Sequence, residues 1–136
     1  MAADKAQRAD KSRRILVALE QLHRVEQWKM ADLERRLAEL EKEQLELIGA
    51  LNATNALHGL FIDATARRLG TTAEEAERVA RAKEAQALTL KEHATRVKIS
   101  ERVTLVHEQE AAREREAKEL LEIVEQTVGR KRTSLP

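Results

Sequence analysis

Gly70-Thr71-Thr72-Ala73-Glu74-Glu75 stands near the midpoint of a sequence that otherwise contains few helix-breaking residues. A Gly just past a helix is a common stop signal, and Thr72 followed by Glu75 matches the capping box that begins a new helix. We therefore expect two helices of similar length that meet at a tight break. This arrangement predicts an all-α fold, an antiparallel coiled-coil hairpin, either with or without a short helix at its tip.

The composition favours long helices. Of the 136 residues, 36% are charged and 1% are aromatic, and the single proline is the last residue, Pro136. Such a composition is typical of coiled coils. The alternative is disorder, which the 42% hydrophobic content disfavours because apolar residues are numerous enough to line both arms. The absence of cysteine excludes a disulfide framework and a thiolate metal site.

The first arm carries two apolar stripes. The first runs from Leu16 to Val25, and the second runs from Met30 to Leu51 in alternating steps of three and four, with one polar member, Gln44. This spacing is that of a heptad seam. The step from Val25 to Met30 is out of phase, so we expect the seam to change face near Trp28.

The segment from Gly49 to Gly59 leaves two alternatives open. Its small residues and two asparagines lower the helix propensity. Either the helix continues through it, or the helix breaks around Asn55 to Gly59 and a short segment, 60–69, precedes the restart at Thr72. Both alternatives keep the tip of the hairpin between Leu57 and Thr72.

We expect a single domain with arm one at about 10–57, a tip region at 58–72, arm two at about 72–128, and a disordered basic tail at 129–136. The inner face of arm two is predicted to run from Ala76 to Val97 and, after a phase change, through Val103, Val106 and Leu120 to Val128. A turn at Gly70 would set the small residues of both arms against one another near the tip.

Basic residues gather at both ends of the chain. The net charge is only +1, but Arg13 and Arg14 lie near the start, and Arg130, Lys131 and Arg132 lie near the end. A hairpin closed at Gly70 would bring these two groups together at its open end. They therefore form a candidate partner-binding site, whereas the lack of interleaved aromatic residues and the acidic stretch 108–125 disfavour nucleic acid.

Two further candidate contact sites are apolar. Leu60 and Phe61, with Arg67 and Arg68 beside them, mark the expected tip, where loops are exposed and Phe is a common interface anchor. Their other role is to plug the end of the hairpin. Trp28 lies off the leucine stripe, so it is either a packing plug at the phase change or an exposed hot spot.

No pattern in the sequence predicts catalysis, a cofactor or a metal. Glu20 and His23 have the Glu-x-x-His spacing of di-iron bundles, but such sites need a second pair, which this sequence lacks. Phosphate loops and nucleophile elbows are absent. No apolar run follows Met1–Lys5, so we expect neither a signal peptide nor a membrane span, and we infer a cytoplasmic non-enzyme.

The stretches Arg13-Arg14-Ile15-Leu16, Leu33-Glu34-Arg35-Arg36-Leu37 and Leu120-Leu121-Glu122-Ile123-Val124-Glu125-Gln126, with the ending Ser134-Leu135-Pro136, resemble a known family. The chain is similar over most of its length to the stalk proteins of bacterial flagellar and type III export machines, the FliJ/YscO family. The resemblance rests on overall pattern, because no diagnostic motif maps residue by residue.

The resemblance implies a non-catalytic stalk or adaptor in protein export. Its expected partners are a hexameric export ATPase, the export gate and export chaperones, and it would reach the membrane only through them. The resemblance implies that the basic open end enters the ATPase pore. Other interpretations remain: a coiled-coil adaptor of another complex, or a basic-tailed nucleic-acid accessory protein. The sequence is compatible with a monomer or a homodimer.

Overall fold

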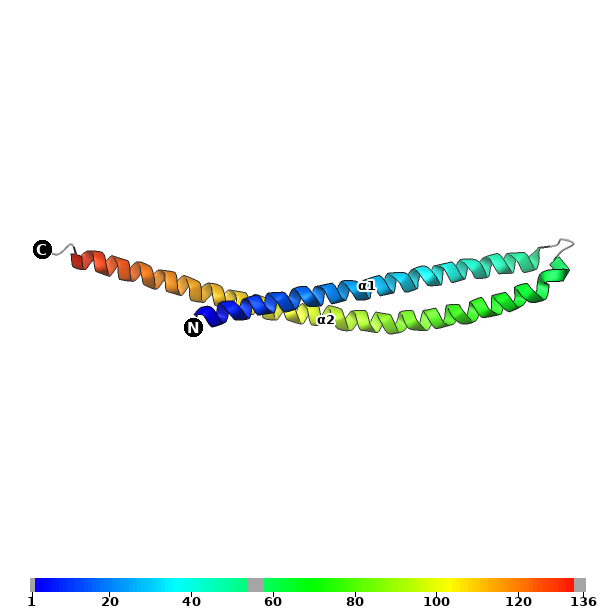
Figure 1. The fold of residues 1–136 in the computed structure, drawn as a ribbon, viewed down its shortest axis with the longest axis horizontal. Coiled ribbons are helices and arrows are strands. Elements are labelled where there is room, and N and C mark those ends of the chain that lie inside the picture. Colours follow the sequence, from blue (N-terminus) through cyan, green and yellow to red (C-terminus); the bar gives the residue numbers. More distant parts are fainter. Residues whose placement is uncertain (1, 54–57, 134–136) are drawn as a thin grey trace. The chain divides into compact units, whose positions relative to one another are not determined.

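The computed structural model describes residues 2–53 and 58–133 (Figure 1). It contains two long helices, α1 (Ala2–Asn52) and α2 (His58–Thr133), which pack against each other. The described residues include no strand. The predicted all-α fold with a helical hairpin is therefore confirmed.

The predicted break at Gly70 is wrong. Gly70, Thr71 and Thr72 lie inside α2, and Gly70 does not adopt a positive φ. The Thr71 hydroxyl donates to the carbonyl of Arg67 at 3.1 Å, which is a bond within the helix and not a cap. A mid-helix Gly costs only about 1 kcal/mol relative to Ala. Buried side chains just beyond it, Thr72 and Ala76, favour continuing the helix.

The helix break lies instead between Asn52 and His58. The last turn of α1 tightens, because the Ala53 amide donates to the carbonyl of Ala50 at 3.3 Å. This agrees with a break within the low-propensity segment 49–59. The predicted short segment 60–69 with a restart at Thr72 is wrong, since α2 begins at His58 and continues through Thr72. Residues 54–57 lie outside the described residues.

The other predicted boundaries also shift. α1 begins at Ala2, well before residue 10, and the predicted tip region 58–72 forms the first turns of α2. The predicted disordered tail is helical as far as Thr133. Residues 134–136 lie outside the described residues. The helices are longer than expected because no proline or left-handed residue interrupts them.

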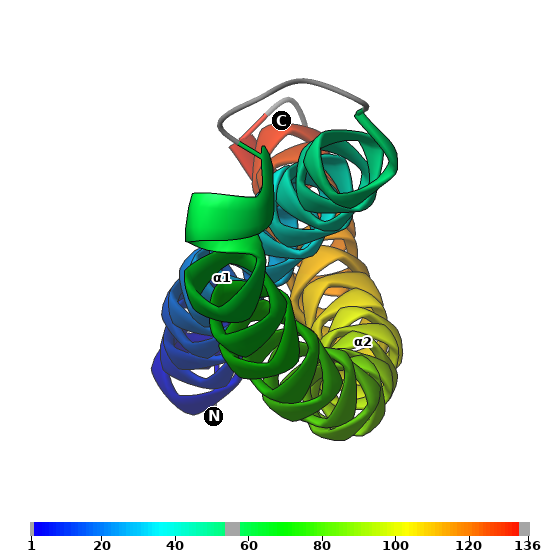
Figure 2. The same ribbon diagram turned by 90° about the vertical axis from the view of Figure 1, so that its right-hand side faces the viewer.

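The chain divides into two compact units. We call residues 22–93 the central region, and residues 1–21 together with 94–136 the terminal region. Each region contains part of α1 and part of α2. In the central region, the end of α1 and the start of α2 lie side by side in both views (Figures 1 and 2).

The seam of the central region is a continuous heptad in both helices. Its half-buried and buried residues recur at alternating steps of three and four, with no phase change near Trp28. The predicted members Leu22 and Val25 are 51% and 40% exposed, and polar residues occupy the seam in their place. The α1 seam is His23, Glu26, Met30, Leu33, Leu37, Leu40, Gln44, Leu47 and Leu51; the α2 seam is Thr65, Leu69, Thr72, Ala76, Val79, Lys83, Gln86, Leu90 and His93.

The terminal region keeps the same period but has a different composition. Its α1 seam is Lys5, Ala9, Ser12, Leu16 and Leu19, and its α2 seam is Val97, Ser100, Thr104, His107, Ala111 and Glu114. Small and polar residues dominate, and Thr104 is the most buried member of the α2 seam. The predicted inner residues Val103, Val106 and Leu120 are instead exposed.

The pairing register follows from the position of the turn. Arg36 lies opposite Glu75, whereas a turn at Thr71 would place it opposite Val106. The register therefore sets Ala76 at the level of Leu37, so that small residues of α2 meet large residues of α1. The predicted pairing of small against small near the tip is wrong.

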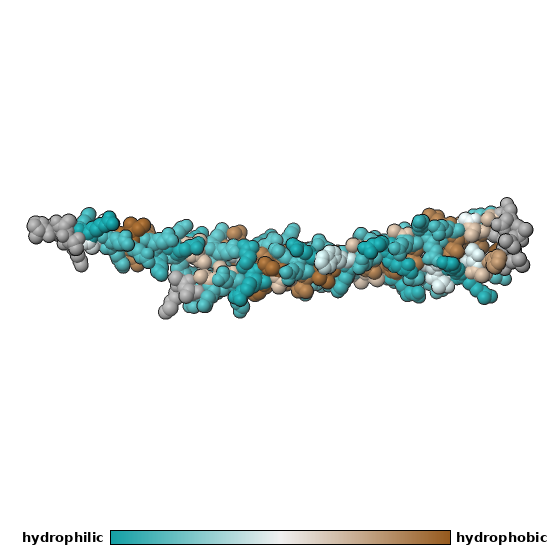
Figure 3. Space-filling model, turned by 45° about the horizontal axis from the view of Figure 1, so that its top comes forward, coloured by the Kyte–Doolittle hydropathy of each residue, from teal (hydrophilic) through white to brown (hydrophobic). Residues whose placement is uncertain are grey.

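α2 extends past the end of the terminal seam. Every residue from Arg115 to Lys131 is exposed, and we call this segment the C-terminal stretch. It carries five large apolar residues: Leu120, Leu121, Ile123, Val124 and Val128. In the space-filling view, hydrophobic colour appears at the surface of this part of α2 among hydrophilic residues (Figure 3).

Candidate functional site

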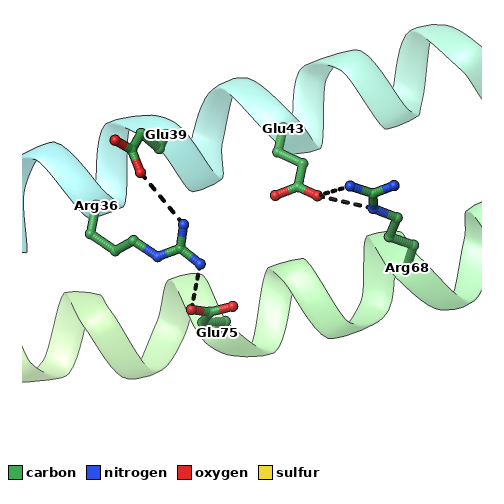
Figure 4. A network of polar contacts seen from close by, with 5 residues as sticks. All are labelled: Arg36, Glu39, Glu43, Arg68 and Glu75. Carbon is green, nitrogen blue, oxygen red and sulfur yellow. Dashed lines mark hydrogen bonds and ion pairs between the residues drawn. The ribbon is translucent and has the colours of Figure 1, made fainter.

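Ion pairs join the two helices beside the central seam (Figure 4). Arg36 Nη2 donates to Glu75 Oε1 at 2.7 Å, and Arg68 Nε donates to Glu43 Oε1 at 3.0 Å. All four residues occupy the position directly before a seam residue. Because these side chains are partly exposed, each pair is worth roughly 0.2–1 kcal/mol. The hydrogen bond from Arg36 to Glu75 raises the pKa of the Arg36 guanidinium.

Two apolar residues occupy the same flanking position in the terminal region. Ile15 and Val103 stand directly before the seam residues Leu16 and Thr104, and both are exposed. Together with Ile99 they border a groove between α1 and α2 with a volume of about 310 Å³. Ser12, Leu19 and Ser100 complete the lining from seam positions, and Arg96 supplies the one charged side chain. This groove is the candidate site.

The heptad position of Arg96 allows the groove to be compared with the central ion pairs. Ile15 and Arg96 line the same groove, and each stands directly before a seam residue, as Glu43 and Arg68 do in the central region. In the central region α1 supplies a Glu to such an Arg, whereas in the terminal region α1 supplies Ile. The groove is therefore open and apolar where the equivalent central surface is bridged by charge.

The predicted basic cluster is not assembled. The Arg13 Nε and Nη2 both donate to Glu108 Oε1, at 2.9 and 2.7 Å. Arg130 and Lys131 lie further along α2, roughly 33 Å beyond Glu108 at ~1.5 Å per residue. The two basic groups stay apart because the turn precedes His58 and not Thr72. Arg14 is exposed.

The predicted tip residues lie in the first turns of α2, and Trp28 is exposed. Phe61 and Arg67 are exposed, and Arg68 pairs with Glu43. The side chains of Leu60 and Arg132 lie outside the described part of the structure. Trp28 is 66% exposed because it lies midway between two seam positions, so its predicted role as a packing plug is wrong.

A polar layer crosses the central seam. The Gln86 amide donates to both the backbone carbonyl and the Oε2 of Glu26, at 2.9 and 2.6 Å, and Lys29 donates to Glu26 Oε1 at 3.1 Å. The hydrogen bond from Gln86, then that from Lys29, lowers the pKa of Glu26, while burial opposes the shift. A polar pair at the seam favours one register over others.

Several other buried polar atoms lack hydrogen bonds within the described residues. They are the Nδ1 atoms of His23, His93 and His107 and the hydroxyl of Thr104. Despite the Glu-x-x-His spacing at Glu20, no three His, Asp or Glu side chains in residues 2–53 and 58–133 are placed to hold a metal ion. These polar atoms lie along the seam and do not converge on a common cavity.

The apolar residues of the groove are visible in the sequence, but they do not lie at the heptad positions of the seam. Ile15, Ile99 and Val103 are apolar residues that a stripe search either leaves out or assigns to the seam. Only the correct heptad phase, which runs through the polar residues His23 and Glu26, identifies them as flanking and exposed.

No protein-family model matches the chain, and neither the curated proteins nor the solved structures give a match. Within the described residues, no helix is long and apolar enough to cross a bilayer.

Proposed function

We propose that the protein is a non-catalytic coiled-coil adaptor whose terminal region binds an apolar helix of a partner protein. The single observation that carries this proposal is the groove of Ile15, Ile99 and Val103, which exposes apolar side chains where the central region has ion pairs. Contiguous exposed apolar surface commonly marks a protein–protein contact.

The groove suits a helix in its chemistry. A partner helix would insert apolar residues spaced three and four apart between Ile15 on α1 and Ile99 and Val103 on α2. Arg96 at the edge of the groove favours an acidic residue flanking those anchors. The expected partner is therefore an amphipathic helix with a Glu or Asp beside its apolar face.

The resemblance to the flagellar and type III export stalk proteins suggests which partner to test first. We propose a cytoplasmic role in protein export, with the export ATPase, export gate or export chaperones as partners. Arg13 is a poor probe of this idea, because changing it also breaks its bonds to Glu108. Arg14, which is exposed, is the cleaner charge to reverse.

The Ile15→Glu variant tests the groove. The introduced carboxylate would face Arg96 as Glu43 faces Arg68, so the hairpin keeps its stability while the groove loses its apolar wall. We expect affinity for a purified export ATPase, measured by calorimetry, to fall at least about tenfold, which is ~1.4 kcal/mol. Ile48→Glu is the matched control, because Ile48 is 44% exposed against 48% for Ile15 and lies outside the groove.

The outcomes separate the two parts of the proposal. Equal binding by wild type, Ile15→Glu and Ile48→Glu would exclude the groove as the contact surface. Failure of wild type to bind an export ATPase, gate or chaperone component would remove the export assignment. Reversal of Arg14 should weaken ATPase binding more at low salt than at high salt, because surface charges are screened by ions.

A further inference from the structure

The C-terminal stretch carries an apolar stripe on one side of the helix. Successive residues of a helix are rotated by about 100° around its axis, and on this basis five apolar residues of the stretch fall within about 100° of arc. Glu119, Glu122 and Gln126 lie on the opposite side. The stripe consists of Ala117, Leu120, Leu121, Val124 and Val128, all exposed.

This stripe does not continue the seam that faces α1. The seam phase, extended beyond Glu114, would pass through Lys118, Leu121, Glu125 and Val128, so half of its positions are charged. The apolar stripe instead uses Ala117 and Val124, one residue earlier. The centre of the stripe therefore lies to one side of the extended seam, and only Leu121 and Val128 belong to both.

We propose that the stripe pairs with the same stripe of a second copy, in antiparallel orientation, to form a homodimer. Antiparallel pairing sets Leu121 opposite Val124 of the second copy and Ala117 opposite Val128. By symmetry each of these contacts occurs twice. Every apolar residue of the stripe then lies opposite or beside an apolar residue in the stripe of the second copy.

The charged residues beside the stripe favour pairing with a second copy of this chain in the antiparallel orientation. At the flanks of the antiparallel pair, Lys118 lies next to Glu125 of the second copy, twice. A parallel pair would instead set Lys131 against Lys131 and Arg113 beside Lys118, which repel. The sequence of the stripe thus complements itself only when one copy is reversed.

The short length of the stripe limits the strength of the dimer. It spans fewer than two complete heptads, and short helical pairs are marginal in water. We therefore expect a reversible monomer–dimer equilibrium that depends on protein concentration. Sedimentation equilibrium of the full chain across a wide concentration range measures it.

The double variant Leu121→Glu/Val124→Glu tests the stripe. It should weaken dimerisation at least about a hundredfold, because four new carboxylates would face one another in the dimer. Leu88→Glu is the matched control: Leu88 is also an exposed Leu in α2 but lies outside the stripe. Circular dichroism checks that both variants remain helical. A wild type that stays monomeric up to millimolar concentration, or a double variant that dimerises like wild type, would overturn the proposal.

Disulfide trapping tests the orientation cleanly because the chain has no cysteine. Antiparallel pairing predicts that an equal mixture of Ala117→Cys and Val128→Cys forms a mixed disulfide under mild oxidation. Neither variant alone should cross-link, since its equivalent residue lies roughly 16 Å away along the axis and a disulfide needs Cα atoms within about 7 Å. Cross-linking of each variant with itself, but not in the mixture, would contradict the antiparallel pair.

A charge exchange provides a second check of orientation. Lys118→Glu should weaken the dimer, and Lys118→Glu/Glu125→Lys should restore it; persistent weakness in the double variant would contradict the antiparallel pair. The dimer does not depend on the groove, so Ile15→Glu should dimerise like wild type. Loss of partner binding through Ile15→Glu and loss of dimerisation through the stripe are therefore separable results.

Discussion

The central and terminal regions use one heptad pattern in opposite ways. The central region buries Leu40, half-buries Leu33 and Leu37, and places the pair Arg36–Glu75 on its flank. The terminal region buries Leu16 and Thr104 and leaves Ile15 exposed. The two regions therefore share the heptad period but differ in which residues fill the seam and which residues lie beside it.

The central region packs its apolar residues between its own two helices, whereas the terminal region leaves apolar residues for another chain to cover. Burial of apolar surface stabilises a helix pair in proportion to its area, and the central region obtains this burial from its own two helices. In the terminal region the exposed Ile15, Ile99 and Val103 contribute fully only when another chain covers them. A buried hydroxyl without a hydrogen bond, as in Thr104, further weakens the isolated region.

The largest expected effect is the replacement of the central leucine Leu40, which is 1% exposed. Leu40→Ala should destabilise the protein by about 2–5 kcal/mol, because it removes buried methyl groups and leaves a cavity in the seam. Leu16→Ala in the terminal region should cost less, since water can enter beside its small polar neighbours. Urea unfolding followed by far-ultraviolet circular dichroism measures both.

Leu88→Ala is the control for these two variants, because Leu88 is exposed and its truncation should change stability little. A greater loss for Leu16→Ala than for Leu40→Ala would contradict the distinction between the two regions.

A smaller effect of opposite sign is expected at Thr104. Thr104→Val replaces a buried hydroxyl that has no hydrogen bond in the described structure with a methyl group of similar size. Removing that unsatisfied group should stabilise the terminal region by about 1 kcal/mol. Thermal unfolding of the variant beside wild type measures the change.

Thr89→Val provides the contrast for Thr104→Val, because the Thr89 hydroxyl donates to the carbonyl of Ala85 at 3.3 Å. It should give no stabilisation. If both variants raised the unfolding temperature equally, β-branched packing and not the unsatisfied hydroxyl would explain the gain at Thr104.

The smallest expected effect concerns the polar layer at Glu26. Hydrogen bonds from Gln86 and Lys29 hold its pKa below the ordinary value of 4.5. Its stabilising contribution is therefore fully present above pH 4.5 and is lost as the pH falls through the lowered pKa. The urea midpoint of wild type should drop more across this acidic range than that of Glu26→Gln. Identical acid profiles would show that the layer does not stabilise the charged form.

Composition and the heptad spacing of apolar residues predicted the long helices, whereas the hairpin was predicted from the local signal at Gly70 and Thr72. The position of the turn was missed, since Gly70 and Thr72 have the local chemistry of a helix stop and restart. That signal is worth about 1 kcal/mol, and the burial of Thr72 and Ala76 in a continuing seam outweighs it.

The groove was missed for a related reason. The apolar residues Leu22 and Val25 predict a seam that changes face near Trp28. The structure instead keeps one phase through His23 and Glu26, where hydrogen bonds from Gln86 satisfy Glu26. Polar residues can occupy a seam when a partner satisfies them, and this cannot be read from one arm alone.

The sequence by itself determined that this chain is helical and that apolar residues recur along it at heptad spacing. These are local properties, set by propensity and spacing. Only the tertiary structure decided which residues face each other, because the break between Asn52 and His58 sets Arg36 against Glu75 and Arg68 against Glu43. In the terminal region the structure pairs Arg13 with Glu108, leaves Ile15 and Val103 exposed beside the seam, and leaves the C-terminal stretch without α1 beside it.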